Sequence, residues 1–182
     1  MDNLANILEG ILFCAGDPIE KSLIKEKLEI TEKDLNKAIT ELEEKFNKNE
    51  SGIILIKFNN KLQFASNSIY SEKIDLVLKK TKERALSKTI METLAIIAYK
   101  QPVTRLEIEN IRGGAPADYA LRALLEHKLI TIVGRKESLG RPLLFGTTDE
   151  FLKRFDLENL TQLPDFENLI NQINEIHNKK PS

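Results

Sequence analysis

The sequence predicts an α+β fold, mainly α-helical with small β-hairpins, built from two similar units and a C-terminal tail. Three observations predict it. Apolar residues recur at helical spacing along most of the chain, two β-prone runs follow the third helical stretch in each half, and the order of these stretches repeats. The 182 residues are 41% hydrophobic and 30% charged, which is typical of a soluble globular protein with one medium-sized or two small domains.

The first helix is predicted over residues 4–15, because its apolar residues are spaced i, i+3, i+4 and i+7. This apolar face comprises Leu4, Ile7, Leu8, Ile11, Leu12 and Ala15. Cys14 lies in the same apolar stretch, so we expect its thiol to be buried and unreactive. A second helix is expected near 20–29, and Thr31 opens a third with the capping-box-like run T-E-K-D.

A β-hairpin is predicted after the third helix. Its strands are GIILIKF at 52–58 and KLQFAS at 61–66, on either side of the polar turn Asn59-Asn60. A helix near 69–82 then closes the first unit.

The second half of the chain repeats this order. Its first helix has an apolar face made of Ile90, Leu94, Ile97 and Ala98. Thr104 starts a short helix with Glu107 three residues on, which is the spacing of a true capping box. A third helix is expected over 115–128, and the runs at 130–133 and 143–147 predict another hairpin ahead of a last short helix.

Three helices followed by a two-stranded hairpin make the winged-helix variant of the helix-turn-helix. The two halves also align by residue, with 7–24 over 90–108, which indicates a duplication. We therefore predict a first winged-helix domain at 1–84, a second at 85–156, and a C-terminal tail at 157–182.

The tail contains one amphipathic stretch, LPDFENLINQINEI at 163–176. A short helix there would place on one side Phe166, Leu169, Ile170, Ile173 and Ile176. The stretch has no predicted place in either domain.

The run GRKESLGRPLLFGTT at 134–148 has the composition of a phosphate-binding loop but not its spacing. Five residues separate Gly134 from Gly140, Pro142 removes a backbone donor, and a strand rather than a helix follows. We interpret the run as the wing of the second domain. Its basic side chains are the candidates for weak DNA contact: Arg135, Lys136 and Arg141.

No catalytic, cofactor or metal site is predicted. His127 and His177 have no carboxylate or cysteine at a metal-ligand spacing, and no G-x-S-x-G or Cys/His pairing suggests a nucleophile. No apolar run approaches the roughly 20 residues that span a membrane. The N-terminus does not resemble a signal peptide, so we expect a cytoplasmic protein without membrane contact.

Charge distinguishes two function classes for such a protein. Residues 81–156 carry 13 basic and 10 acidic side chains, and the third helix of each half mixes both signs. A DNA reader held by about 6–10 phosphate contacts needs as many well-placed cations. A partner-binding adaptor is therefore favoured, and a winged-helix DNA-binding transcriptional regulator is the alternative.

Three runs of the second half carry a family resemblance: TLAIIAYKQPVTRLEIENIRG at 93–113, ALRALLEHKLI at 120–130 and VGRKESLGRPLLFGTTDEFLKRF at 133–155. They resemble the segregation and condensation protein B family. The resemblance implies a non-enzymatic adaptor that forms homodimers through its first domain. The dimer would bind the kleisin subunit, segregation and condensation protein A, at the ATPase heads of the structural-maintenance-of-chromosomes protein. It would act at the nucleoid in chromosome condensation and segregation before cell division.

Two interaction surfaces are expected. The dimer candidates are Leu4, Ile7, Leu8 and Ile11, because a small domain cannot easily bury every apolar residue of its helices; the alternative is that they face the second domain. For the kleisin we expect a groove beside AYKQPVTR at 98–105, with Tyr99 as an aromatic anchor and Lys100 and Arg105 as rim charges. The alternative is that Tyr99 belongs to the core.

Overall fold

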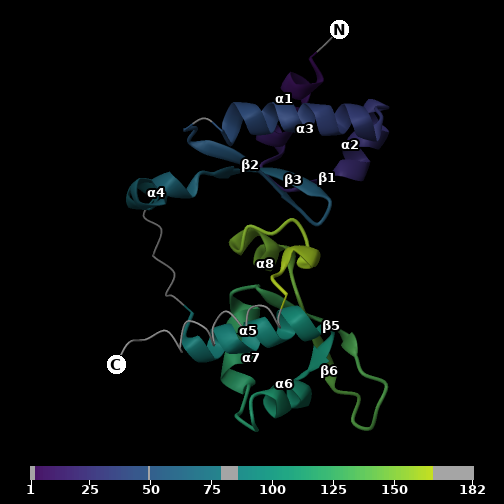
Figure 1. Cartoon of the computed structure of the whole chain (residues 1–182), viewed down its shortest axis with the longest axis vertical. Coiled ribbons are helices and arrows are strands. Elements are labelled where there is room, and N and C mark those ends of the chain that lie inside the picture. The colour runs from purple at the N-terminus through teal and green to yellow at the C-terminus, as the bar shows by residue number, and fades with distance from the viewer. Residues whose placement is uncertain (1–2, 49, 79–85, 166–182) are drawn as a thin grey trace. The chain divides into compact units, whose positions relative to one another are not determined.

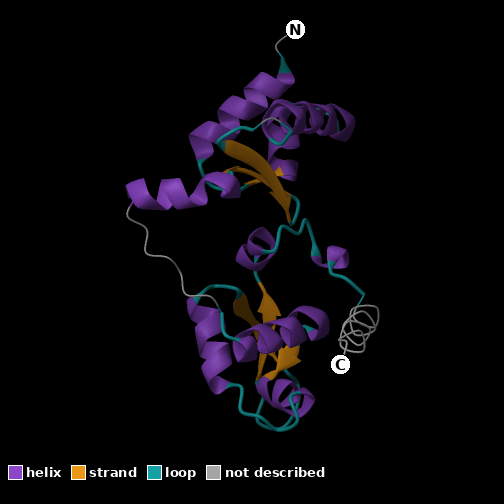
Figure 2. Ribbon diagram, turned by 60° about the vertical axis from the view of Figure 1, so that its left-hand side comes forward, coloured by secondary structure: helices purple, strands orange, loops and turns teal. Residues whose placement is uncertain are grey.

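The computed structural model describes residues 3–48, 50–78 and 86–165. The chain divides into two compact units, Met1–Arg84 and Ala85–Ser182 (Figure 1). Each unit combines helices with a small antiparallel sheet (Figure 2). The predicted α+β fold class is therefore confirmed.

Three helices build the body of the first unit: α1 (Leu4–Ala15), α2 (Lys21–Leu28) and α3 (Glu32–Phe46). Side chains cap two of their N-termini. The Asn3 carboxamide oxygen accepts a hydrogen bond from the backbone N–H of Ala5 at 3.0 Å. Thr31 and Asp34 form a complete capping box, as the T-E-K-D run predicts. These bonds satisfy N–H groups that have no partner within the helix.

The sheet of the first unit has the order β1-β3-β2 and consists of β1 (Ile19–Glu20), β2 (Ile53–Phe58) and β3 (Lys61–Ser66). The predicted hairpin is confirmed. Its turn residues Asn59 and Asn60 have φ angles of 44° and 59°, the left-handed region that asparagine tolerates. Strand β1, in which Ile19 pairs with Leu62, was not predicted because two residues are too short to show an alternating pattern.

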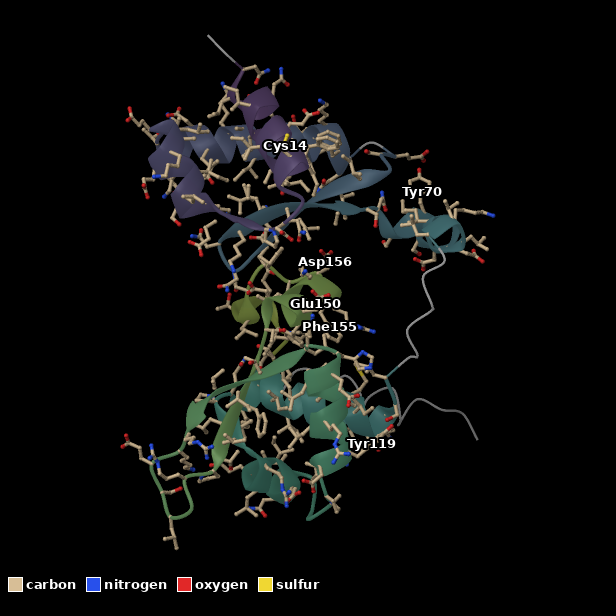
Figure 3. All side chains as sticks on the ribbon, turned by 180° about the vertical axis from the view of Figure 1, so that it is seen from behind. Cys14, Tyr70, Tyr119, Glu150, Phe155 and Asp156 are labelled. Carbon is tan, nitrogen blue, oxygen red and sulfur yellow. The ribbon has the colours of Figure 1, made fainter. Side chains whose placement is uncertain are left out.

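The core of the first unit lies between the helices and one face of the sheet. Its buried members are Ala5, Leu8, Leu12, Ile24, Leu35, Ala38, Ile39, Leu42, Leu55 and Leu62. Cys14 is exposed (Figure 3), so the expectation of a buried thiol is wrong. Cys14 follows the buried Leu8 by about 1.7 helical turns, so its side chain leaves α1 on the side away from the core.

A 3₁₀ turn, Ser68–Tyr70, and the helix α4, Ser71–Leu78, follow the hairpin. The Tyr70 hydroxyl donates a hydrogen bond to the backbone oxygen of Glu50 at 3.1 Å. None of the residues of α4 is buried. The end of the helix predicted near 69–82 lies outside the described residues.

The second unit repeats the element order of the first, as predicted. Its elements are α5 (Lys88–Lys100), β4 (Val103–Thr104), α6 (Arg105–Ile111), α7 (Asp118–Glu126), β5 (Ile130–Arg135), β6 (Leu143–Thr147), α8 (Asp149–Arg154) and a 3₁₀ turn (Leu160–Gln162). The sheet order β4-β6-β5 corresponds to β1-β3-β2 of the first unit. The capping box between Thr104 and Glu107 is confirmed.

The buried stripes of α1 and α5 correct the residue alignment between the halves. The stripe of α1 is Ala5, Leu8 and Leu12, and three buried residues of α5 lie 85 positions further on: Ile90, Thr93 and Ile97. The predicted alignment of 7–24 over 90–108 puts the fully buried Leu8 on Met91, which is 38% exposed. It is wrong by two residues in this helix, because residue identity does not show which side of a helix is buried.

Gln101 fixes the start of β4 against β6 in the second unit. Its amide oxygen accepts a hydrogen bond from the backbone N–H of Thr147 at 2.7 Å, and its amide nitrogen donates to the Thr147 hydroxyl at 2.9 Å. A Cβ on the neighbouring Gly146 would lie 2.9 Å from the Gln101 amide oxygen. A larger residue at position 146 would therefore force the side chain of Gln101 or Val133 to shift.

Candidate partner-binding site

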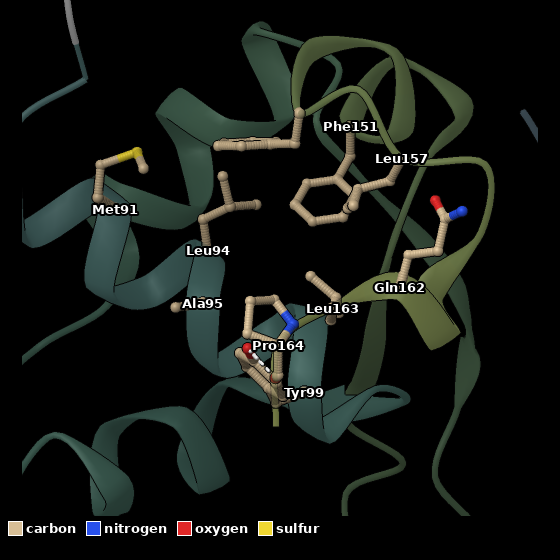
Figure 4. A pocket seen from close by; sticks show the side chains of 10 residues that line it. Met91, Leu94, Ala95, Tyr99, Phe151, Leu157, Gln162, Leu163 and Pro164 are labelled. Carbon is tan, nitrogen blue, oxygen red and sulfur yellow. Dashed lines mark hydrogen bonds between the residues drawn. The ribbon is translucent and has the colours of Figure 1, made fainter. Parts of the chain in front are cut away.

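An apolar groove runs along α5 within the second unit (Figure 4). Its volume is about 360 Å³, and it is lined by Met91, Leu94, Ala95, Tyr99, Phe151, Phe155, Leu157, Gln162, Leu163 and Pro164. The four residues from α5 are spaced i, i+3, i+4 and i+8, so they lie on one face of the helix. Nine of the ten lining side chains carry no charge or amide group, which makes the groove a site for apolar side chains.

The helix α8 forms one wall of the groove. The Thr148 hydroxyl caps this helix by accepting a hydrogen bond from the backbone N–H of Phe151 at 3.3 Å. The rings of Phe151 and Phe155 lie with their centroids 5.0 Å apart. Both rings line the groove, and Phe151 is buried whereas Phe155 is 38% exposed.

Residues 157–165, which we call the strap, form the opposite wall. The strap begins with a hydrogen bond from the backbone N–H of Leu157 to the oxygen of Leu152 at 2.9 Å. Near its end, the Tyr99 hydroxyl donates a hydrogen bond to the backbone oxygen of Pro164 at 2.7 Å (Figure 4). The strap is thus fastened to the body of the unit at both ends.

The three predicted kleisin-contact residues do not share one site. Tyr99 is half-buried and lines the groove, whereas Lys100 is exposed and lies outside the lining. Arg105 begins α6 and forms ion pairs with Glu109, at 3.2 Å, and with Asp118 of α7. Arg105 therefore joins α6 to α7, and only Tyr99 is part of the groove.

Two of the three basic side chains of the wing, Arg135 and Lys136, have partners within the unit. The Lys136 ammonium lies 2.5 Å from the carboxylate of Glu107. This contact, with the hydrogen bonds from Thr104, lowers the pKa of Glu107 to about 2. Arg135 donates a hydrogen bond to the backbone oxygen of Arg141 at 3.1 Å. The wing is therefore held against the start of α6, with Lys136 committed to an acidic partner.

The dimer candidates on α1 differ in how far they reach the surface. Leu8 has 0% exposure, because it packs in the core of its own unit, and so has no surface to offer a partner. Leu4 and Ile11 are half-buried, and Ile7 is 38% exposed. The most exposed large apolar side chains of the unit are not among these candidates: Phe13 of α1 at 77%, Ile69 at 72%, Leu76 at 70%, Val77 at 80% and Leu78 at 59%.

Sequence reasoning missed most of the groove. Met91 and Ala95 stand beside the predicted apolar face of their helix, and Phe155 and Leu163 were not assigned to any site. Their signal was a second apolar stripe on the helix at 88–100, next to the stripe that fills the core. The sequence alone does not show whether an apolar stripe packs in the core or lines a groove.

Within the described ranges, no helix is long and apolar enough to cross a membrane. In the same ranges, no group of three or more His, Cys, Asp or Glu side chains is placed to hold a metal ion.

Two winged-helix units in one chain, one of them with an apolar groove, place the protein among tandem winged-helix proteins. Residues 6–166 match the family of the segregation and condensation complex subunit ScpB, and the chain belongs to this family. Segregation and condensation protein B of Clostridium acetobutylicum is 40% identical over 171 residues, covering 94% of this chain and 84% of the relative. The protein of the same name from Clostridioides difficile is 39% identical over 170 residues, covering 92% and 94%.

A solved relative is the crystal structure of ScpB from Mycobacterium tuberculosis. It is 27% identical, covers 86% of this chain and 96% of that chain, and has a TM-score of 0.42. The family assignment gives the chain a role in chromosome segregation and condensation.

Proposed function

We propose that the chain is a non-enzymatic adaptor subunit of a bacterial condensin-like complex. As a homodimer it binds the kleisin, segregation and condensation protein A, at the ATPase heads of the structural-maintenance-of-chromosomes protein. Its place is then the cytoplasm, at the nucleoid. The family assignment supports this role, and the apolar groove along α5 is the observation that carries it at the level of residues.

The groove has the chemistry that an amphipathic helix of a partner requires. Its floor is Leu94, 2% exposed, and its rim includes Met91 and Phe155, each 38% exposed. A helix that inserts its apolar face would cover these side chains, which is a common mode of peptide recognition. The Tyr99 hydroxyl adds a polar group at one end of an otherwise apolar site.

Substitution of Ala95 by arginine tests the groove directly. Ala95 is exposed and lines the groove, so Ala95→Arg would obstruct it without disturbing the core. Glu92→Arg is the matched control, because Glu92 is exposed on the same helix but outside the lining. By calorimetry with the middle segment of the kleisin, we expect at least tenfold weaker binding for Ala95→Arg only. Equal affinity of the two variants would show that the kleisin binds elsewhere.

The first unit supplies the dimer surface in this proposal. Helix α4 has eight residues, none of them buried, and exposes Leu76, Val77 and Leu78. A helix of this length is marginal in water by itself, so contact with a second copy would stabilise it. Of the candidates on α1, Ile7 remains the one with the most exposed surface.

Light scattering on size-separated protein tests the dimer. Val77→Glu should convert the dimer to a monomer, because it places a charge in an apolar interface, while circular dichroism stays unchanged. Ile7→Ser should weaken the dimer less, and Lys73→Glu, on an exposed polar position of α4, should leave it intact. A monomeric wild-type chain at micromolar concentration would refute the dimer.

The alternative function, a DNA-binding transcriptional regulator, rests on the basic wing. Lys136 is paired with Glu107, which leaves Arg135 and Arg141 as the exposed arginines for a weak phosphate contact. Two cations fall short of the 6–10 phosphate contacts of a tight DNA binder. A salt titration on duplex DNA separates the alternatives: the adaptor predicts weak binding that is lost at physiological salt, and the regulator predicts tight binding there.

A further inference from the structure

We infer that the groove along α5 is also a binding site for the chain's own tail, residues 166–176, which would lie in it as an amphipathic helix antiparallel to α5. The docking does not depend on the proposed kleisin role. It follows from where the strap ends, from the spacing of apolar residues after it, and from the exposed apolar surface in the groove.

The strap delivers the tail to one end of the groove. Described structure ends at Asp165, directly after Pro164, whose backbone oxygen accepts the hydrogen bond from Tyr99 at 2.7 Å. The described chain therefore ends beside Tyr99, at the C-terminal end of α5, and the tail continues from there. A segment held this close to its site binds with a high effective concentration, since no separate encounter is needed.

The tail has the apolar spacing that the groove can accept. Its apolar residues at i, i+3, i+4 and i+7 are Phe166, Leu169, Ile170 and Ile173. At 1.5 Å per residue, Phe166 to Ile173 would span about 10 Å of helix, and Tyr99 to Met91 spans about 12 Å of α5. An antiparallel helix would therefore put Phe166 opposite Tyr99 and Ile173 opposite Met91, with Ala95 between them leaving room.

Charge complementarity favours the same docking. Lys100 and Lys88 are exposed at the two ends of α5. The antiparallel direction brings Glu167 to the end that carries Lys100, and Glu175 to the end that carries Lys88. A parallel helix would also bring each glutamate to a lysine, so the antiparallel direction follows from the end of the strap beside Tyr99 and not from charge.

Disulfide trapping in the full-length chain tests the inference. Cys14 is the only cysteine, so Cys14→Ser gives a cysteine-free background. Met91→Cys with Ile173→Cys places thiols at the predicted contact. Tyr119→Cys with Ile173→Cys is the matched control, because Tyr119 is 72% exposed on α7 and lies outside the groove lining.

Under mild oxidation we expect an intrachain disulfide in at least fivefold higher yield for the 91/173 pair than for the 119/173 pair, measured on non-reducing gels and by peptide mass spectrometry. Adding Ala95→Arg to the 91/173 pair should lower the yield to that of the control. Equal yields of the two pairs, a yield unaffected by Ala95→Arg, or a product only at dimer mass would each overturn the inference. No kleisin is present, so the result is independent of the kleisin proposal.

Discussion

The two units share one topology, but the hollows beside their first helices, α1 and α5, are lined by different kinds of side chain. In the first unit, α1 borders a hollow with Asn6, Glu9, Gly10 and Phe13, and Lys45 pairs with Glu9 at 2.6 Å. The residues 85 positions after the first three are Met91, Leu94 and Ala95, which line the groove of the second unit. The same side of the first helix therefore borders a hollow in each unit. The hollow of the first unit combines the Glu9–Lys45 ion pair with apolar side chains, whereas the groove of the second unit has no charged lining residue.

The helices that follow the two hairpins differ in how much of their surface is buried. Helix α8 buries Phe151 and Leu152 and completes the second unit, whereas α4 buries none of its residues. The second unit thus has its last helix packed into its own core, beside the groove. The first unit leaves apolar surface at Phe13 and on α4. In the proposed function, the first unit self-associates through this exposed surface and the second unit captures a partner helix.

The largest expected effect tests whether the buried stripes are equivalent. Leu12 is 1% exposed and Ile97 is 0% exposed, at corresponding positions of α1 and α5. Leu12→Ala and Ile97→Ala should each cost about 2–5 kcal/mol of folding stability, because each leaves a cavity. Hydrogen exchange should locate each loss in the unit that carries the substitution. Loss of protection in both units from either substitution would show that they do not fold independently.

The next effect tests whether the two hollows differ in function. Gly10 corresponds to Ala95, and a Cβ added at Gly10 meets nothing within 4 Å. Gly10→Arg should therefore be tolerated and should leave kleisin affinity within about twofold, whereas a tenfold loss for Ala95→Arg corresponds to about 1.4 kcal/mol. Calorimetry with the same kleisin segment measures both. Equal losses would mean that both hollows hold the partner.

These elements show which parts of the fold could be predicted from the sequence. The helical spacing in α1 and the capping boxes at Thr31 and Thr104 are local patterns, so helix positions and starts could be predicted. Strands β1 and β4 could not, because two residues carry no periodicity and each strand depends on pairing with a distant partner.

The candidate site was predicted only at Tyr99. The other walls come from α8 and the strap, more than fifty residues away in sequence, and a contact over such a distance leaves no local pattern. Arg105 carries a charge beside the predicted groove, but its partners Glu109 and Asp118 are set by the packing of α6 on α7. The sequence likewise did not show that Leu8 lies in the core and Cys14 on the surface.

A smaller effect is expected when the pH dependence of folding stability is compared for the two capping boxes. Lys136, the largest cause, and Thr104 lower the pKa of Glu107 from 4.5 to about 2. Asp34 also has a lowered pKa, caused first by the hydrogen bond from Thr31. A carboxylate whose pKa is lower in the folded than in the unfolded state stabilises the fold above the unfolded pKa, and the stabilisation is lost as pH falls through the folded pKa.

Thermal unfolding between pH 4.5 and about 2 measures this difference. The melting temperature of Glu107→Gln should fall less than that of the wild type over this range, since the variant has no carboxylate at position 107 to protonate. Asp34→Asn should differ from the wild type by less, because Asp34 pairs with a hydroxyl and Glu107 with a lysine at 2.5 Å. A larger effect at Asp34 would indicate that the wing contact of Lys136 contributes nothing.

The smallest effect concerns the bond that fastens the strap, for which the first unit has no counterpart among its described residues. Tyr99→Phe removes the hydroxyl that donates to the Pro164 oxygen at 2.7 Å but keeps the ring in the groove. A single hydrogen bond of this kind contributes about 0.5–1.5 kcal/mol, so global stability should change little. Backbone amides of residues 160–163 should exchange several-fold faster, and the 91/173 disulfide should form in lower yield, because the tail then starts from a less fixed position. Unchanged exchange in these residues would mean that α8, rather than Tyr99, holds the strap.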